Sequence, residues 1–194
     1  MSSRGNSTKE RIVNAALALL EGDQRDATRL SDVAKKAGVS RQAIYLHFGS
    51  RAEVLIAATK ALDAQLDMDS QLQASRTAPS GRVRLEAFVL AWCSYVPKIY
   101  RVAKPLMDMA ATDTEAASAW SQRMSDMREG CAAAIQALHA DGDLPANTDP
   151  EMATDLMWSM LSVTTWEDLV QRRGWAQTTY EREMVAACQR LFIA

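Results

Sequence analysis

The chain has 194 residues, of which 48% are hydrophobic and 24% are charged, and its formal net charge is −2 at pH 7. This composition is typical of an ordinary globular protein and excludes collagen-like, disulfide-rich and extensively disordered chains. The near-neutral charge also excludes a uniformly basic surface for nucleic acid, although it is compatible with a local basic surface.

The three cysteines, Cys93, Cys131 and Cys188, are far apart and odd in number. They fit neither a disulfide framework nor a zinc site built from Cys-x-x-Cys pairs. No stretch approaches the roughly 18 to 20 apolar residues of a membrane span, and the polar first six residues have no signal-peptide core behind them. We therefore expect a cytoplasmic protein with no membrane partner, no metal and no cofactor.

The charges are distributed unevenly along the chain. Residues 1–60 hold ten lysines and arginines against six acidic residues, a net charge of +4, whereas residues 61–194 hold twelve against eighteen, a net charge of −6. Chance can produce such a split, but a basic N-terminal part on an acidic remainder also suits contact with a polyanion such as double-stranded DNA.

Helical periodicity is found along nearly the whole chain, and no segment shows the bounded apolar and polar alternation of a strand. We therefore expect an all-α protein of about nine helices. Ser7 and Glu10 have the spacing of a capping box that opens the first helix, and residues 21–23 end it.

Residues 30–48 have the layout of a helix-turn-helix. Apolar residues recur at helical spacing from Leu30 to Ala37, Gly38 follows as the turn residue, and Ser40 is a good N-cap for a third helix. In this motif Val39, Ile44 and Phe48 pack inward, which leaves the outer face of the third helix for a ligand.

The outer face of this third helix carries the residue types that bind DNA. The candidate DNA-binding residues are Ser40, Arg41, Gln42, Ala43, Tyr45, His47 and Arg51. An arginine, a glutamine and an alanine in the first turn suit guanine, adenine and a thymine methyl group. Tyr45 and His47 can donate to phosphates, and so can Arg51, with free backbone N–H groups beside it. Taken singly, Tyr45 could instead cap the small core and His47 could be a solvated surface group.

The next helices are less regular. Ser50 and Glu53 form a second capping-box pair and predict a helix over residues 51–73, followed by a loop over residues 75–81. The helix after that loop should be interrupted at Pro97, and Pro105 should break or kink the segment that follows.

Three further helices complete the chain. Thr112 and Glu115 predict a third capping box ahead of a long helix that ends at residues 141–143. Asp149 followed by Pro150 opens a helix over residues 150–172, and a last helix covers residues 176–192.

Residues 7–60 resemble the DNA-binding domain of the TetR family of bacterial transcriptional regulators. The motifs that carry the resemblance are Asp-Val-Ala at residues 32–34, Gly-Val-Ser at 38–40 and Ile-Tyr-Leu-His-Phe-Gly-Ser-Arg at 44–51. The chain departs from the pattern at Arg29, where the family commonly has a threonine that caps the second helix. Thr28 could take over this cap, or the start of the helix could shift by one residue.

The resemblance implies two domains, a helix-turn-helix domain over residues 1–55 and an effector-binding and dimerisation domain over residues 56–194, with the helix from residue 51 linking them. It also implies a homodimer formed by the last two long helices, which would bind a palindromic operator. The helix over residues 150–172 has apolar or small groups on two sides, as such an interface requires. The alternative is a monomer in which this helix is unusually buried.

A small-molecule effector site would use the soft and aromatic residues of the second domain. The candidates are Trp92, Tyr95, Met107, Trp120, Met124, Met127, Cys131, Trp158 and Trp166. An ordinary helical core would contain the same residue types. Glu167 and Asp168 would suit a cationic ligand if they pointed inward, but we expect them to be solvated.

Nothing in the sequence indicates catalysis, because it contains no phosphate-binding glycine loop, zinc-ligand spacing or nucleophile elbow. We therefore expect a DNA-binding transcriptional regulator, in this family most often a repressor, that is released from DNA by a small hydrophobic or aromatic effector. The alternatives are an architectural DNA-binding protein that needs no ligand and, more remotely, an enzyme with an appended helix-turn-helix.

Overall fold

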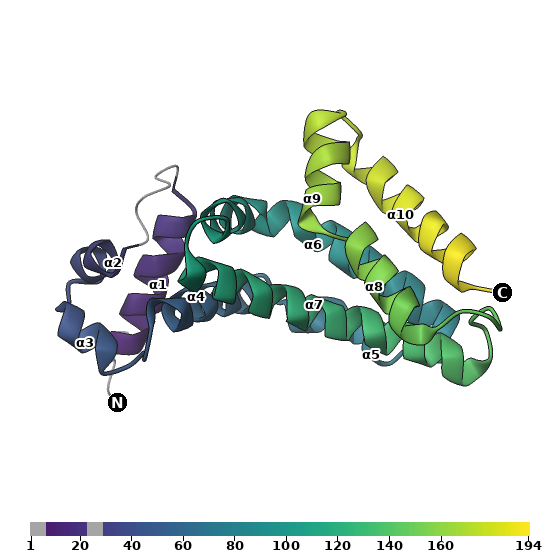
Figure 1. The fold of residues 1–194 in the computed structure, drawn as a ribbon, viewed down its shortest axis with the longest axis horizontal. Helices are drawn as coiled ribbons and strands as arrows, with labels where there is room; N and C mark the ends of the chain where they lie inside the picture. Colours follow the sequence, from purple (N-terminus) through teal and green to yellow (C-terminus); the bar gives the residue numbers. More distant parts are fainter. Residues whose placement is uncertain (1–6, 23–28) are drawn as a thin grey trace. The chain divides into compact units, whose positions relative to one another are not determined.

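The computed structural model describes residues 7–22 and 29–194, and these residues form helices and no strand (Figure 1). In chain order the elements are α1 (Thr8–Leu20), α2 (Leu30–Ala37), α3 (Arg41–Tyr45), α4 (Arg51–Gln65), α5 (Met68–Arg76), α6 (Gly81–Ala110), α7 (Thr114–Asp141), α8 (Pro150–Met160), α9 (Val163–Trp166), the π-helix η1 (Glu167–Arg172) and α10 (Gln177–Phe192). The all-α prediction is confirmed. The described residues hold ten α-helices where about nine were expected, because two predicted helices are divided and two predicted segments are joined.

The chain forms two compact units, and both are discontinuous in sequence. The first comprises Met1–Leu66 and Ile99–Arg123, and the second comprises Asp67–Lys98 and Met124–Ala194. The first unit thus adds the end of α6 and the start of α7 to the helix-turn-helix segment. The boundary expected at residue 55 lies within α4.

In the first unit, α1 packs against α2 and α4. Its N-terminus has the predicted capping box, since the Ser7 hydroxyl accepts from Glu10 N at 3.2 Å and the Glu10 carboxylate accepts from Ser7 N at 2.7 Å. Ile12 is fully buried, and Lys9 lies 5.5 Å from the centre of the Phe48 ring. These contacts attach the end of the helix-turn-helix segment to α1.

The helix predicted over residues 51–73 is divided in two. α4 ends at Gln65, Asp67 has a left-handed backbone with φ of 50°, and α5 begins at Met68. Aspartate enters this region more easily than most residues. The sequence pattern did not reveal the break, because residues 65–67 contain neither glycine nor proline.

α6 runs through Pro97 and Pro105 as one helix. The predicted interruption at Pro97 is therefore wrong, and of the break or kink predicted at Pro105 the break is wrong. A proline has no N–H to donate to the carbonyl four residues earlier, which for Pro97 is Cys93 O. The side-chain amide of Gln177 donates to this carbonyl instead, with 2.9 Å between Nε2 and O. A tertiary hydrogen bond therefore satisfies the group that the proline leaves open.

The start of α7 also differs from its prediction. Thr112 does not cap the helix. Asp113 does, because its Oδ1 accepts from Glu115 N and Ala116 N, both at 3.0 Å. The predicted capping box between Thr112 and Glu115 is thus replaced by an aspartate cap one residue later, and the Glu115 carboxylate is used elsewhere.

In the second unit, Gly130 of α7 faces Phe88 of α6. A Cβ atom at Gly130 would lie 2.5 Å from Phe88 Cε2, closer than real side chains approach. Because a side chain here would push α6 and α7 apart, this mid-helix glycine permits their close packing.

The helix predicted over residues 150–172 is also divided. α8 ends at Met160, and the Ser162 hydroxyl accepts from Thr165 N at 3.1 Å to begin α9, which continues directly into η1. Ser162 competes for a backbone donor, and the β-branched residues that follow it are poor helix formers. The last predicted helix is confirmed as α10.

All three cysteines are free and buried in the second unit. Burial raises the pKa of each thiol, to about 12 at Cys93 and at Cys188, and the pKa of Cys131 is raised as well. At neutral pH they therefore stay protonated and behave as small apolar core residues. Among the described helices, none combines the length and the apolar character needed to cross a membrane.

Candidate nucleic-acid interface

A left-handed glycine joins α2 to α3. Gly38 has φ of 65°, and Val39 N donates to Ala34 O at 3.0 Å, which closes the end of α2. The Ser40 hydroxyl accepts from Ala43 N at 3.1 Å and caps α3. The predicted turn glycine and the predicted N-cap are both confirmed, and together they fix where α3 begins.

Two apolar side chains hold α3 against the first unit. Ile44 is fully buried and Phe48 nearly so. On the opposite side, the exposed residues of α3 and the turn after it are Arg41, Gln42, Tyr45, Leu46 and His47. Tyr45 is 52% exposed, which excludes a role as a cap on the small core. The first turn of α3 therefore presents polar groups outward, as direct contact with base edges requires.

Leu46 was not among the predicted candidates, yet it is the most exposed large apolar residue of the described chain at 84%. Its place between two residues of the outer face could have revealed it, because a leucine beside Tyr45 and His47 has no core to join. An exposed apolar group can contact thymine methyl groups or sugars.

The N-cap of α2 is Arg29, whose side chain makes no capping hydrogen bond. Asp32 N and Val33 N donate instead to the Arg29 carbonyl, at 2.9 and 3.1 Å. The alternative cap, Thr28, lies outside the described residues. α2 thus begins where the apolar pattern predicts.

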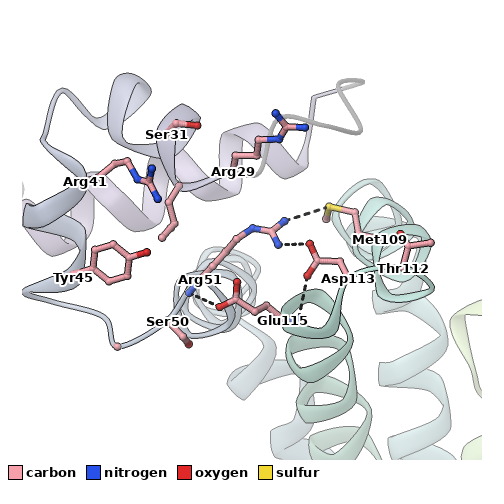
Figure 2. Close-up of a pocket in the computed structure, with 12 residues that line it drawn as sticks. Arg29, Ser31, Arg41, Tyr45, Ser50, Arg51, Met109, Thr112, Asp113 and Glu115 are labelled. Atoms are coloured by element: carbon pink, nitrogen blue, oxygen red, sulfur yellow. Dashed lines mark hydrogen bonds and ion pairs between the residues drawn. The ribbon is translucent and has the colours of Figure 1, made fainter.

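Arg51 begins α4, and its guanidinium points toward the segment that joins α6 to α7 (Figure 2). The guanidinium forms an ion pair with Asp113, and Nη2 lies 3.8 Å from Met109 Sδ. The side chain is only 13% exposed. A phosphate contact would require Arg51 to point outward. In this conformation its side chain is instead bonded within the first unit.

The backbone at the start of α4 is engaged too. Glu115 Oε1 accepts from Arg51 N at 3.0 Å and from Ala52 N at 3.4 Å. Glu53 N donates to the Ser50 hydroxyl at 3.2 Å, while the Glu53 carboxylate accepts from Gly49 N at 2.9 Å. The expectation that these N–H groups are free for a phosphate is wrong, because a carboxylate from a distant part of the sequence already binds them.

Asp113 is ionised over a wide pH range. Partial burial by itself would raise its pKa, but hydrogen bonds from Ala116 N, from the Arg51 guanidinium and from Glu115 N outweigh that effect and hold the pKa below its usual range. Asp113 therefore carries a full negative charge beside Arg51 at neutral pH.

Arg51, Asp113 and Glu115 line an open cleft of about 660 Å³ within the first unit. The other residues that line it are Arg29, Leu30, Ser31, Arg41, Tyr45, Gly49, Ser50, Met109 and Thr112. Figure 2 shows Arg41 and Tyr45 on α3 and Arg51 between α3 and Asp113, all lining this cleft. The recognition helix and the start of α4 thus share one polar concavity.

The predicted effector residues are divided between the two units. Met107 and Trp120 belong to the first unit and the remaining seven to the second. Trp92, Tyr95, Met127, Cys131 and Trp166 are buried, while Met107, Trp120, Met124 and Trp158 are half-buried.

The indole N–H groups of three candidate effector residues are satisfied by the protein itself. Trp92 Nε1 donates to Leu161 O at 2.7 Å, Trp158 Nε1 donates to Met124 O at 3.0 Å, and Trp166 Nε1 donates to Gln177 Oε1 at 2.8 Å. These donors stabilise the packing of the second unit, so an effector there would meet the faces of the rings rather than their polar edges.

Glu167 is buried, contrary to the expectation that it is solvated. Its carboxylate lies 3.4 Å from Arg172 Nη2, and the half-exposed Asp168 pairs with Nη1 of the same arginine at 2.8 Å. η1 thus turns one acidic side chain inward and supplies its counter-ion. Within the described part of the chain, no group of three or more His, Cys, Asp or Glu side chains could hold a metal ion.

Comparison with known proteins identifies the N-terminal segment. A family model described as bacterial regulatory proteins, tetR family, matches residues 12–58. The HTH-type transcriptional regulator SrpR of Pseudomonas putida is 34% identical over 68 residues, which are 35% of this chain and 32% of SrpR. The uncharacterized HTH-type transcriptional regulator TtgW, also of Pseudomonas putida, is likewise 34% identical over 68 residues, which are 35% of this chain and 51% of TtgW. The chain therefore matches about a third of the length of one relative and half of the other.

Solved structures resemble the whole chain in fold. A putative TetR-family regulator from Rhodococcus sp. has a TM-score of 0.74 at 19% identity and covers 95% of this chain and 97% of its own. FadR of Bacillus subtilis in complex with stearoyl-CoA has a TM-score of 0.70 at 15% identity, covering 92% and 96%. The SmeT–triclosan complex has a TM-score of 0.69 at 17% identity, covering 97% and 93%. With the helix-turn-helix geometry, these findings lead to one conclusion: residues 12–58 match the tetR family of bacterial regulatory proteins, and the chain shares the fold of solved TetR-family regulators.

Proposed function

We propose that the protein is a dimeric transcriptional repressor that binds a palindromic operator through α3 and leaves DNA when a small hydrophobic or aromatic effector binds. The observation that carries the proposal is the construction of α3. Its inner residue Ile44 is fully buried, while Arg41, Gln42 and Tyr45 are exposed on the outer face. A short helix held this way can enter the major groove without unfolding its own core.

The roles of the individual residues follow from their chemistry. Arg41 can bond guanine and Gln42 can bond adenine, whereas Ala43 and Leu46 offer apolar contact to a thymine methyl group. Ser40, Tyr45 and His47 can donate to phosphates, and such contacts fix position rather than sequence.

The dimer is supported by apolar side chains on the surface of the second unit. On α8, Met152 is 72% exposed and Leu156, four residues later, is 47% exposed. Leu191 of α10 is 47% exposed, and α8 packs with α10. Because residues four apart lie on one helix face, Met152 and Leu156 form a patch that a second copy of the chain can cover symmetrically.

The effector is supported by analogy. The solved structures of FadR and SmeT contain stearoyl-CoA and triclosan. The protein must have two conformations, one that fits DNA well and one that fits it poorly. An effector releases DNA only if its affinity is higher for the second conformation. In the second unit of this chain, Trp92 and Tyr95, whose ring centres lie 5.7 Å apart, are both buried, so an effector that contacts them would have to enter the core.

Selection from a pool of random DNA duplexes tests the proposal. The expected result is enrichment of an inverted repeat whose half-sites lie about one helical turn, or a multiple of it, apart. A panel of hydrophobic small molecules added to the selected complex should contain compounds that release it. Binding without sequence preference would instead indicate an architectural DNA-binding protein, and turnover of a compound would indicate an enzyme.

A further inference from the structure

We propose that Asp113 and Glu115 form a carboxylate latch that occupies the anion-binding start of α4, so that a DNA phosphate must displace them to bind there. The latch consists of these two side chains with Arg51 and the backbone N–H groups of Arg51 and Ala52. This inference rests on the proposed DNA-binding function and adds a control on its strength.

The contacts of the latch are specific. Glu115 Oε1 accepts from two successive backbone N–H groups, of Arg51 at 3.0 Å and of Ala52 at 3.4 Å. Asp113 pairs with the Arg51 guanidinium, which is 13% exposed, while Asp113 is 34% exposed. The partners lie far apart in sequence, so the contacts depend on the folded first unit.

A carboxylate and a phosphate compete for these donors because both are anions. The oxygens of each, in a plane for the carboxylate and in a tetrahedron for the phosphate, accept hydrogen bonds. The first N–H groups of a helix carry partial positive charge and bind either anion. A guanidinium matches either one with paired hydrogen bonds. The next N–H of the turn, on Glu53, is already bonded to Ser50 Oγ at 3.2 Å. The N–H groups of Arg51 and Ala52 therefore become available to a phosphate only when the Glu115 carboxylate moves away.

The latch is placed where its opening would affect DNA binding. Arg51 lines the same cleft as Arg41 and Tyr45, which project from α3 (Figure 2). A guanidinium released from Asp113 would add a cation to the surface that the recognition helix presents. The closed latch instead sets two negative charges beside that surface, which weakens its attraction for a polyanion.

Removal of the latch charges tests the inference in the full-length protein. Asp113→Asn keeps a good N-cap for α7, and Glu115→Gln keeps an acceptor oxygen, so both variants should fold. The probe is a fluorescently labelled duplex of about 24 base pairs and mixed sequence, long enough for two helical turns. Fluorescence anisotropy is measured over a series of KCl concentrations.

We expect Asp113→Asn to bind this duplex about fivefold more tightly than the wild type, the factor that matches the energy of a partly exposed ion pair. Glu115→Gln should gain less, because its amide oxygen can still accept from the two backbone N–H groups. The slope of log K against log[KCl] should steepen by about 0.9, as for one additional phosphate contact. In an Arg51→Ala background, the gain from Asp113→Asn should be much smaller, because the guanidinium that it frees is absent and only the loss of the Asp113 charge remains.

The matched control is Asp63→Asn. Asp63 pairs with Arg123 at 2.7 Å in the same unit, and its carboxylate is similarly shielded at 24% exposure. This variant removes the same charge without touching the start of α4, so its affinity should stay near that of the wild type.

The outcomes separate the latch from the proposed function. Equal affinity for Asp113→Asn and Asp63→Asn, or weaker binding by the latch variants, overturns the latch while DNA binding by the wild type stands. A gain of undiminished size in the Arg51→Ala background also overturns it. If neither the wild type nor any variant binds the duplex, the DNA-binding function itself fails, and the latch fails with it.

Discussion

Gln177 compensates for a proline in the middle of α6. Its Nε2 donates to Cys93 O at 2.9 Å, the carbonyl that Pro97 leaves without a helical partner, and to Glu181 Oε1 at 2.9 Å. Its Oε1 accepts from Trp166 Nε1 at 2.8 Å. One amide at the start of α10 thus joins α6, α9 and α10.

Gln177→Leu keeps the side-chain volume and removes all three hydrogen bonds. Each bond contributes about 0.5–1.5 kcal/mol, and a buried group left without a partner costs about 1–3 kcal/mol. Cys93 is fully buried. We therefore expect the free energy of unfolding to fall by about 2–3 kcal/mol, measured by urea denaturation followed by circular dichroism at one fixed protein concentration.

A double-mutant cycle with Pro97→Ala isolates the contribution of the proline. Alanine at residue 97 restores an N–H that can donate to Cys93 O, so Gln177→Leu should cost about 1 kcal/mol less in the Pro97→Ala background than in the wild type. An identical cost in both backgrounds would refute the reasoning, because it would mean that Gln177 does not replace the missing backbone bond.

Three further predictions concern packing, assembly and pH. Gly130→Ala should destabilise the protein by about 1–3 kcal/mol, because its Cβ would collide with Phe88; an unchanged melting temperature would contradict this. Leu156→Glu should shift the protein from dimer to monomer in analytical ultracentrifugation, because it places a charge in the proposed interface; an unaltered dimer would exclude the α8 patch. Because the pKa of Asp113 is lowered on folding, its ionised form stabilises the protein above the unfolded-state pKa of about 4, and this contribution is lost as the pH falls through the folded-state pKa. The stability difference between wild type and Asp113→Asn should therefore shrink in acid, and a difference that grows in acid would contradict it.

The helix-turn-helix could be predicted because its determinants are local. Gly38 provides the left-handed turn, Ser40 caps α3, and the buried Ile44 follows within one turn. Each of these features depends on residues no more than a few positions apart. The interactions that form it can therefore be recognised from the sequence pattern alone.

The features that were missed depend on contacts between distant residues. The carbonyl that Pro97 leaves open in α6 is bonded by Gln177, 80 residues later, and Arg51 is bonded by Asp113 and Glu115. Periodicity carries no information on such partners. The break after Gln65 arises differently, from one left-handed residue, Asp67, in a stretch with no glycine or proline to mark it.

The central claim, that α3 reads DNA sequence, is tested most directly by Arg41→Ala on the selected operator and on an unrelated duplex of equal length. We expect the variant to lose about 1–3 kcal/mol of binding free energy on the operator and to relax the preference at one base pair of each half-site, with a much smaller loss on the unrelated duplex. Equal losses on the two duplexes, or no loss on either, would contradict the assignment of Arg41 and the orientation of α3 on DNA.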